Sequence, residues 1–125
     1  MKYAISTKDA PSPQGPWSQG TSAARYIFIS AQLPLDPSSD EIIDGSIEDK
    51  MLKSLTNCEE ILKEIHMSRY DIAKLTVFVD NIDYQTEINS ALSKFFHSPY
   101  PALSLVEVRR LPYDSPLSCE CIACR

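Results

Sequence analysis

The chain has 125 residues, enough for one domain with a hydrophobic core of its own. Hydrophobic residues make up 43% and charged residues 23% of the sequence, and both fractions are ordinary for a globular protein. The net charge of −5 argues against binding to nucleic acid or to an anionic membrane surface, because both require a basic patch. No apolar run reaches the roughly 18 residues of a membrane-spanning helix.

The beginning of the chain, MKYAISTKDAPSP, lacks the apolar core of a signal peptide, so we expect a cytoplasmic protein with reduced cysteines. Three of the four cysteines lie in the run CECIAC, where strand alternation places Cys119 and Cys121 on one face and Cys124 on the other. This arrangement favours small buried residues over a metal site, with a reactive thiol as the remaining alternative.

The N-terminal half of the sequence alternates short extended segments with a long loop. Residues 2–6 and 25–30 (RYIFIS) have the composition of strands. Residues 10–20 (APSPQGPWSQG) are typical of a loop because of their prolines and glycines. Residues 32–36 (QLPLD) and 41–44 (EIID) flank a turn and predict a hairpin.

A helix of about 20 residues is expected to follow Ser46. Ser46 and Asp49 have the spacing of a capping box. An apolar stripe at helical spacing is formed by Ile47, Met51, Leu55, Cys58, Leu62 and Ile65. The stripe predicts the core-facing side, and Asn57 is expected on the polar side.

The C-terminal half predicts a strand, a helix and two further strands. Residues 75–79 (LTVFV) are apolar on both faces, as in a central strand. Asp83 is expected to cap a second helix that ends before Pro99. Its inward residues are expected to be Tyr84, Ile88, Ala91, Leu92 and Phe95. The last strands are expected at residues 102–108 and 117–123.

The resulting order β-ββ-α-β-α-β-β predicts a two-layer α+β fold, with two helices packed on one face of a mixed sheet and one domain over residues 1–125. The strands are too apolar for the other sheet face to stay in water. We therefore expect self-association to cover that face.

Two side chains are candidates for function on their own chemistry. Trp17 stands on the loop rich in proline and glycine, where a large ring either packs the loop or lines a pocket. Glu120 lies between two cysteines in an apolar strand, where a buried carboxylate is costly. Glu120 either faces solvent from an edge strand or is held in a pocket, able to move a proton or orient a water.

Six segments fall in the order and spacing of the RidA/YjgF family, so the chain resembles that family from about residue 3 to residue 123. The segments are APSPQGPWSQG, YIFISAQLPLDP, LTNCEEILKE, KLTVFVDNID, YPALSLVEVRRLP and ECIA. The resemblance implies a chorismate-mutase-like fold, a homotrimer with ligand clefts between subunits, and no cofactor. It also implies hydrolysis of reactive 2-imino and enamino acids to 2-keto acids with release of ammonia. Some relatives carry older labels such as endoribonuclease, an activity that the acidic charge disfavours.

The resemblance also assigns site positions. Trp17 stands where active members carry an aromatic residue, usually tyrosine, while Ser30 is kept and Ala31 replaces a glycine. Asn89 matches an asparagine of the second helix. Glu120 matches the glutamate that positions the attacking water.

Two leucines depart from the family pattern. Leu103 stands where the resemblance expects the arginine that binds the substrate carboxylate, and Leu105 where cysteine is frequent. An arginine guanidinium makes two charge-assisted hydrogen bonds to a carboxylate, each contributing roughly 1.5–3 kcal/mol. Loss of both should lower binding or rate by about 10²–10⁴-fold. We expect impaired hydrolysis of 2-imino acids and a preference for a neutral or cationic ligand, unless a neighbouring subunit supplies another arginine.

Three functions therefore stay open. The first is a RidA-like protein that binds some other small molecule in a cleft between subunits. The second is a hydrolase or deaminase that acts on a non-carboxylate imine or enamine through Glu120. The third is a regulatory or protein-interaction trimer whose cleft is vestigial.

Overall fold

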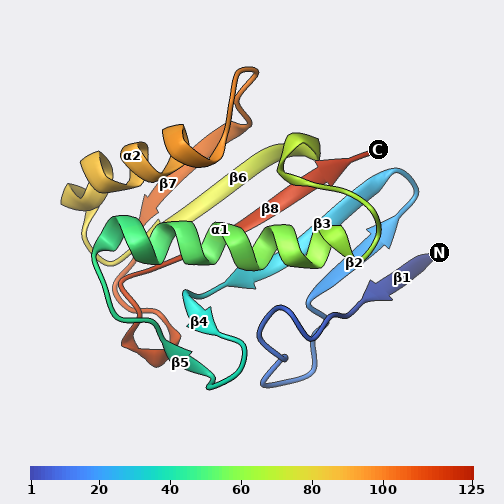
Figure 1. Cartoon of the computed structure of the whole chain (residues 1–125), viewed down its shortest axis with the longest axis horizontal. Helices are drawn as coiled ribbons and strands as arrows, with labels where there is room; N and C mark the ends of the chain where they lie inside the picture. The colour runs from blue at the N-terminus through green and yellow to red at the C-terminus, as the bar shows by residue number, and fades with distance from the viewer.

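The computed structural model describes residues 1–125, with a six-stranded sheet and two helices on one of its faces (Figure 1). The sheet order is β1-β2-β3-β8-β6-β7, with β6 and β7 parallel and the other neighbours antiparallel. Its strands are β1 (Lys2–Ile5), β2 (Gly20–Ala23), β3 (Tyr26–Gln32), β6 (Ile72–Val79), β7 (Ala102–Glu107) and β8 (Leu117–Cys124). The predicted hairpin is a separate sheet of β4 (Leu35–Asp36) and β5 (Glu41–Ile42). The predicted two-layer α+β fold is confirmed.

The sequence does not predict strand β2, which begins where the predicted loop ends, at Gly20. The segment GTSA has only one β-branched residue, so its composition gives a weak strand signal. It becomes a strand because it pairs with β1 on one side and with β3 on the other. A tight turn joins β2 to β3 through Ala24, whose φ of +53° lies in the left-handed region.

Helix α1 (Ile47–Lys63) begins with the predicted capping box. The Ser46 side chain accepts a hydrogen bond from the Asp49 N–H, and the Asp49 carboxylate accepts one from the Ser46 N–H. The centre of the predicted stripe is fully buried, at Met51, Leu55, Cys58 and Leu62. Asn57 was expected on the polar side but is also buried, because the segment after β3 covers it.

Helix α2 (Gln85–Phe95) packs beside α1 on the same sheet face (Figure 1). The expectation that Asp83 caps this helix is wrong. The Asn81 side chain accepts a hydrogen bond from the Asp83 N–H and starts a 3-10 turn, Ile82–Tyr84, that leads into the helix. Asn81 therefore caps the 3-10 turn, and α2 itself begins after Tyr84 with no side-chain cap. The predicted inward residues do face the core, with Ile88, Ala91 and Phe95 buried and Tyr84 and Leu92 half-buried.

Three cysteines meet in the core between α1 and β8. The Sγ of Cys58 lies 3.8 Å from the Sγ of Cys119, and Cys121 is buried nearby. The contact with a neighbouring thiol, together with burial, raises the pKa of both Cys58 and Cys121 well above the usual value. These two thiols stay protonated, so they are poor nucleophiles and act as small core residues.

The other face of the sheet carries no helix (Figure 1). Tyr26 and Phe28 of β3 pair with Cys124 and Ile122 of β8, so their rings lie on this open face. Tyr26 is 50% and Phe28 44% exposed. The chain thus presents apolar side chains where the sequence predicts a surface in need of cover. Neither helix has the length and hydrophobicity required to span a bilayer.

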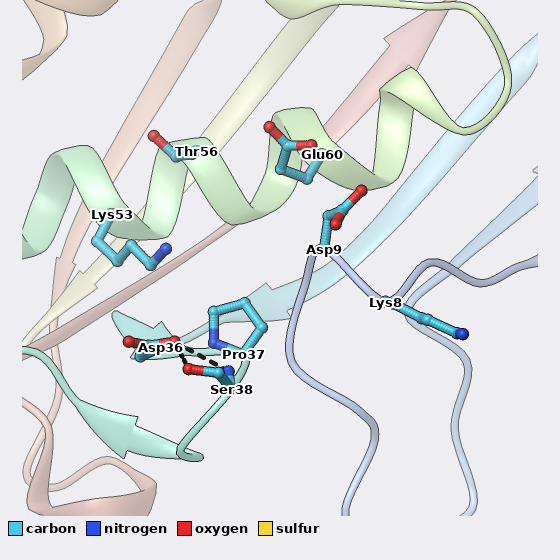
Figure 2. Close-up of a pocket in the computed structure, with 8 residues that line it drawn as sticks. All are labelled: Lys8, Asp9, Asp36, Pro37, Ser38, Lys53, Thr56 and Glu60. Carbon is cyan, nitrogen blue, oxygen red and sulfur yellow. Dashed lines mark hydrogen bonds between the residues drawn. The ribbon is translucent and has the colours of Figure 1, made fainter.

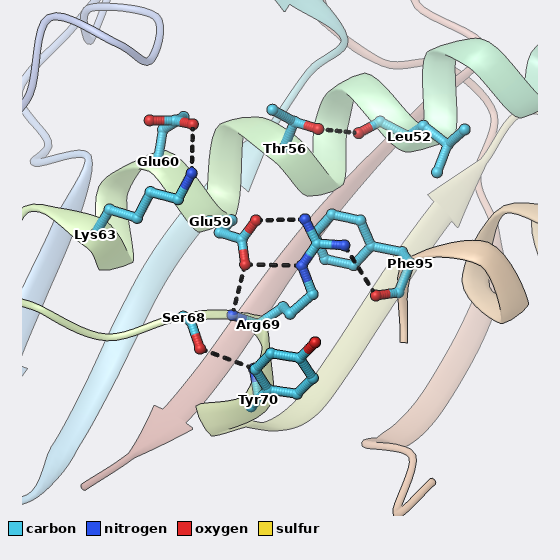
Figure 3. A network of polar contacts seen from close by, with 9 residues as sticks. All are labelled: Leu52, Thr56, Glu59, Glu60, Lys63, Ser68, Arg69, Tyr70 and Phe95. Carbon is cyan, nitrogen blue, oxygen red and sulfur yellow. Dashed lines mark hydrogen bonds and ion pairs between the residues drawn. The ribbon is translucent and has the colours of Figure 1, made fainter. Parts of the chain in front are cut away.

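An ion pair between Glu59 of α1 and Arg69 holds the segment between α1 and β6 against the helix (Figure 3). Arg69 donates from Nη2 to Glu59 Oε1 at 2.6 Å and from Nε to Glu59 Oε2 at 2.8 Å. It also donates to the carbonyl of Phe95 in α2, and its guanidinium lies 3.8 Å from the centre of that ring. Burial opposes the ionisation of Glu59, but the hydrogen bonds from Arg69 outweigh it and lower the pKa of the carboxyl.

Replacing Glu59 by Gln should lower the free energy of unfolding by about 2 kcal/mol at neutral pH, because the half-buried guanidinium loses its charged partner. A carboxyl with a lowered pKa stabilises the fold above its unfolded pKa, and this contribution is lost as the pH falls through the folded value. The difference between wild type and Glu59→Gln should therefore shrink below about pH 4, as measured by urea denaturation.

The control for this experiment is Glu60→Gln, which breaks the more exposed pair with Lys63 on the same helix. Exposed pairs contribute little, so this variant should lose less than about 0.5 kcal/mol. Equal losses of unfolding free energy in the two variants would contradict a larger contribution from the Glu59–Arg69 pair than from the exposed pair.

Candidate functional site

A cavity of about 640 Å³ opens where several segments meet. Its walls come from the loop at residues 11–17, from residues 30–35, from residues 111–113, and from strands β6 and β8. The volume lies in the range of roughly 300–1,000 Å³ that is usual for small-molecule sites. The lining is largely uncharged, and three of its side chains are aromatic: Trp17, Phe78 and Tyr113.

Glu120 projects into this cavity from the middle of the sheet. Strand β8 lies between β3 and β6, so the interpretation of Glu120 as an edge-strand residue is wrong. The ladder between β3 and β8 skips one step, so that Ser30 and Ala31 together oppose Glu120 as a β-bulge. Bulges re-aim side chains and are frequent next to active sites.

Glu120 is also the only charged side chain of the lining, because no lysine, arginine or aspartate contributes to it. None of the four ion pairs of the chain involves Glu120. The cavity therefore presents one carboxylate in a wall of aromatic, aliphatic and neutral polar groups. A ligand that carries a negative charge meets repulsion there and no compensating cation.

Trp17 lines the cavity from the long loop before β2. Its ring lies against the backbone of Gly15, in space that a Cβ at position 15 would fill. Gly15 therefore allows the indole to lie close to the loop backbone. Trp17 is 55% exposed and belongs to the cavity lining, so the residue both contacts its own loop and faces the cavity.

The side chain of Gln19, which is buried, holds this loop in place. Its Nε2 donates to the carbonyls of Thr7, Ala10 and Pro11, and its Oε1 accepts from the Thr7 N–H. One side chain thus satisfies four backbone groups of a segment that has no regular secondary structure. The position of the Trp17 loop depends on these bonds.

Two more side chains fix the wall beside β3. The Ser30 Oγ donates to the carbonyl of Ser18 at 2.6 Å, so its proton is engaged and its lone pairs remain for a ligand. Asn57 of α1 donates from Nδ2 to the carbonyls of Leu33 and Leu35, both of which line the cavity. The wall is therefore tied to the first helix.

Four of the residues predicted for the site line this cavity: Trp17, Ser30, Ala31 and Glu120. Three do not. Asn89 is exposed on α2, and Leu103 and Leu105 lie on the edge strand β7. Leu103 is in register with the buried Leu75, so it points to the helix side of the sheet, while Glu120 points to the open side. One chain alone does not bring Leu103 to the carboxylate.

The sequence does not single out two of the aromatic residues that line the cavity, Phe78 and Tyr113. Phe78 pairs with Ser118, which precedes Glu120 by two residues, so strand alternation could have placed both on the Glu120 face. Tyr113 follows a proline in an irregular loop and has a φ of +63°. No sequence pattern near Tyr113 signals that conformation.

A second hollow lies on the helix side (Figure 2). Lys53, Thr56 and Glu60 of α1 line it together with residues 8–9 and 36–38. Figure 2 shows Lys8 pointing away from the other side chains. The hollow carries charges of both signs and no hydrophobic side chain, unlike most small-molecule sites.

Comparisons with known proteins place the cavity in a wider context. Residues 7–125 match the family model described as endoribonuclease L-PSP. A RutC family protein of Pyrococcus horikoshii is 37% identical over 123 residues, which cover 98% of each chain. A 2-iminobutanoate/2-iminopropanoate deaminase of Bos taurus is 34% identical over 98% of this chain and 90% of its own. The crystal structure of E. coli TdcF with bound serine matches 98% of both chains, with a TM-score of 0.93 and 36% identity.

Replacing Gln19 by Ala should lower the free energy of unfolding by about 2–4 kcal/mol, because buried backbone groups lose their partners. It should also lower the fluorescence anisotropy of Trp17, the only tryptophan of the chain. Gln14→Ala is the matched control, since Gln14 is exposed on the same loop, and should change stability by no more than about 0.5 kcal/mol. Equal effects of the two substitutions would contradict the anchoring role.

Proposed function

Because the chain belongs to the RidA/YjgF family, also described as endoribonuclease L-PSP, we propose that it is a small-molecule-binding protein with impaired hydrolysis of 2-iminobutanoate and 2-iminopropanoate. The observation that carries the proposal is that Glu120 is the only charged group lining the cavity. Both imino acids bring a carboxylate, and the lining offers no cation to bind it. Leu103 stands at the position where the family resemblance expects that cation.

The proposal includes a homotrimer with its cleft between subunits. Two observations support an assembly. The open sheet face exposes the rings of Tyr26 and Phe28, which a neighbouring subunit would cover. Asn89 and Leu103 also lie outside the cavity of their own chain, so another copy would be needed to bring them to a shared cleft. A cytoplasmic location, expected from the sequence, remains part of the proposal.

Three physical costs add up for a carboxylate ligand in such a cleft. A leucine at the arginine position removes two charge-assisted hydrogen bonds, and this loss should lower binding or rate by about 10²–10⁴-fold. It also desolvates the carboxylate without giving a hydrogen bond in return. Glu120, as the remaining charge, repels the same group. Binding of a small ligand is itself compatible with the family, since E. coli TdcF holds serine in its crystal structure.

The test compares wild type with Leu103→Arg on 2-iminopropanoate generated enzymatically in the assay, with ammonia or keto-acid release as the readout. Wild type should be nearly inert, and the arginine variant should gain about 10²-fold or more. Leu103→Gln is the control, since it adds polarity without charge and should gain little. Sedimentation of all three proteins checks that the assembly is unchanged. Rapid turnover by wild type would overturn the proposal.

A second candidate function is hydrolysis of an imine or enamine that has no carboxylate. The observation that favours it is the position of Glu120. This residue lies opposite the bulge at Ser30 and Ala31, has no ion-pair partner and lines the cavity. A carboxylate in such a place can take a proton from water or orient it.

If this second candidate is right, wild type should release ammonia or amine from a neutral enamine, and Glu120→Ala should lower that rate by about 10²-fold or more. Glu87→Ala, which removes an exposed carboxylate from α2, should leave the rate unchanged. Absence of turnover by wild type on neutral enamines and imines would eliminate this candidate.

A further inference from the structure

We infer that the cavity recognises an organic cation, an alkylammonium or amidinium group on an apolar body, with Glu120 as the counter-ion and Trp17, Phe78 and Tyr113 as aromatic walls. This inference rests on the proposed function, because it names the ligand class of the same cavity. The proposed function leaves open whether the ligand is neutral or cationic. The inference specifies a cationic group attached to an apolar body.

The charge of the lining favours a cation over a neutral ligand. Glu120 sits on a central strand between neighbouring strands, so the sheet fixes its position. Its carboxylate has no ion-pair partner in the chain, and no basic side chain lines the cavity. Glu120 is exposed in the single chain, but a ligand with an apolar body would exclude water from the cavity. The attraction between opposite charges grows as the surroundings become less polar than water.

The aromatic rings supply the second part of the recognition. Trp17 comes from the loop before β2, Phe78 from β6 and Tyr113 from the loop before β8, so three separate segments each bring one ring to the cavity. Phe78 pairs with Ser118 and therefore shares the open sheet face with Glu120. Aromatic faces attract ammonium and guanidinium-like groups, and pockets for quaternary ammonium ligands combine several such rings.

The rings are available to a ligand. Trp17 is 55% and Tyr113 47% exposed, so neither is used to fill the core. In contrast, the polar side chains of Gln19 and Ser30 already hold backbone groups of the walls. The cavity volume of about 640 Å³ leaves room for an apolar body beside the charged group.

The experiment uses three probes of similar size: benzyltrimethylammonium, benzyl alcohol and benzoate. Each is titrated into wild type, with Trp17 emission and calorimetry as readouts. The ammonium probe should bind at least tenfold more tightly than benzyl alcohol, and benzoate should bind most weakly. Glu120→Gln should weaken the ammonium probe about tenfold and leave benzyl alcohol unchanged, while Tyr113→Leu should weaken it about threefold or more. Glu87→Gln is the control and should have no effect.

Benzoate binding as tight as the ammonium probe would overturn the inference, as would the absence of ammonium binding or insensitivity to Glu120→Gln. The imine assay separates this failure from that of the proposed function. A wild type that is inert on 2-iminopropanoate but prefers benzoate contradicts only the ligand class. A wild type that hydrolyses 2-iminopropanoate and still prefers the ammonium probe contradicts only the impaired hydrolysis.

Discussion

Helices α1 and α2 both pack on one face of the six-stranded sheet, and the rest of the molecule follows from that asymmetry (Figure 1). The covered face takes the apolar stripe of α1, the inward residues of α2 and the three buried thiols, which together form one continuous core. The open face receives every alternate side chain of β3, β6 and β8. Glu120, Phe78 and Phe28 lie there because they are out of phase with the core residues beside them. The same strands thus provide the core on one side and the cavity floor on the other.

Most polar side chains around the cavity have a structural task. Gln19 binds four backbone groups of an irregular loop, Ser30 binds the carbonyl of Ser18, and Asn57 binds two carbonyls of the segment after β3. Each of these bonds satisfies a backbone group that has no partner in a helix or sheet. Glu120 differs, because no group of the chain neutralises it. A rigid, mostly neutral wall around a single free carboxylate is suited to selecting ligands by charge.

The local features of the fold could be predicted from the sequence, and the long-range ones could not. The cap at Ser46 and the stripe of α1 depend on residues three or four apart, so their spacing is visible in the chain. Strand β2 depends on two partners, and the burial of Asn57 depends on a segment more than twenty residues away. Trp17 and Glu120 were found as isolated residues that fit poorly with their neighbours. Their meeting in one cavity, and the part of Tyr113 in it, depend on loops whose paths no periodicity encodes.

The two hydrogen bonds of Asn57 connect the cavity to the hydrophobic core. Leu33 and Leu35 line the cavity, yet their carbonyls are held by a helix on the far side of the sheet from Glu120. A ligand that packs against these leucines restrains the same backbone that Asn57 restrains. Binding and folding are therefore thermodynamically linked, and the linkage is reciprocal. A ligand in the cavity would stabilise α1 against local opening, and a weakened α1 would lower affinity at a site that it never touches.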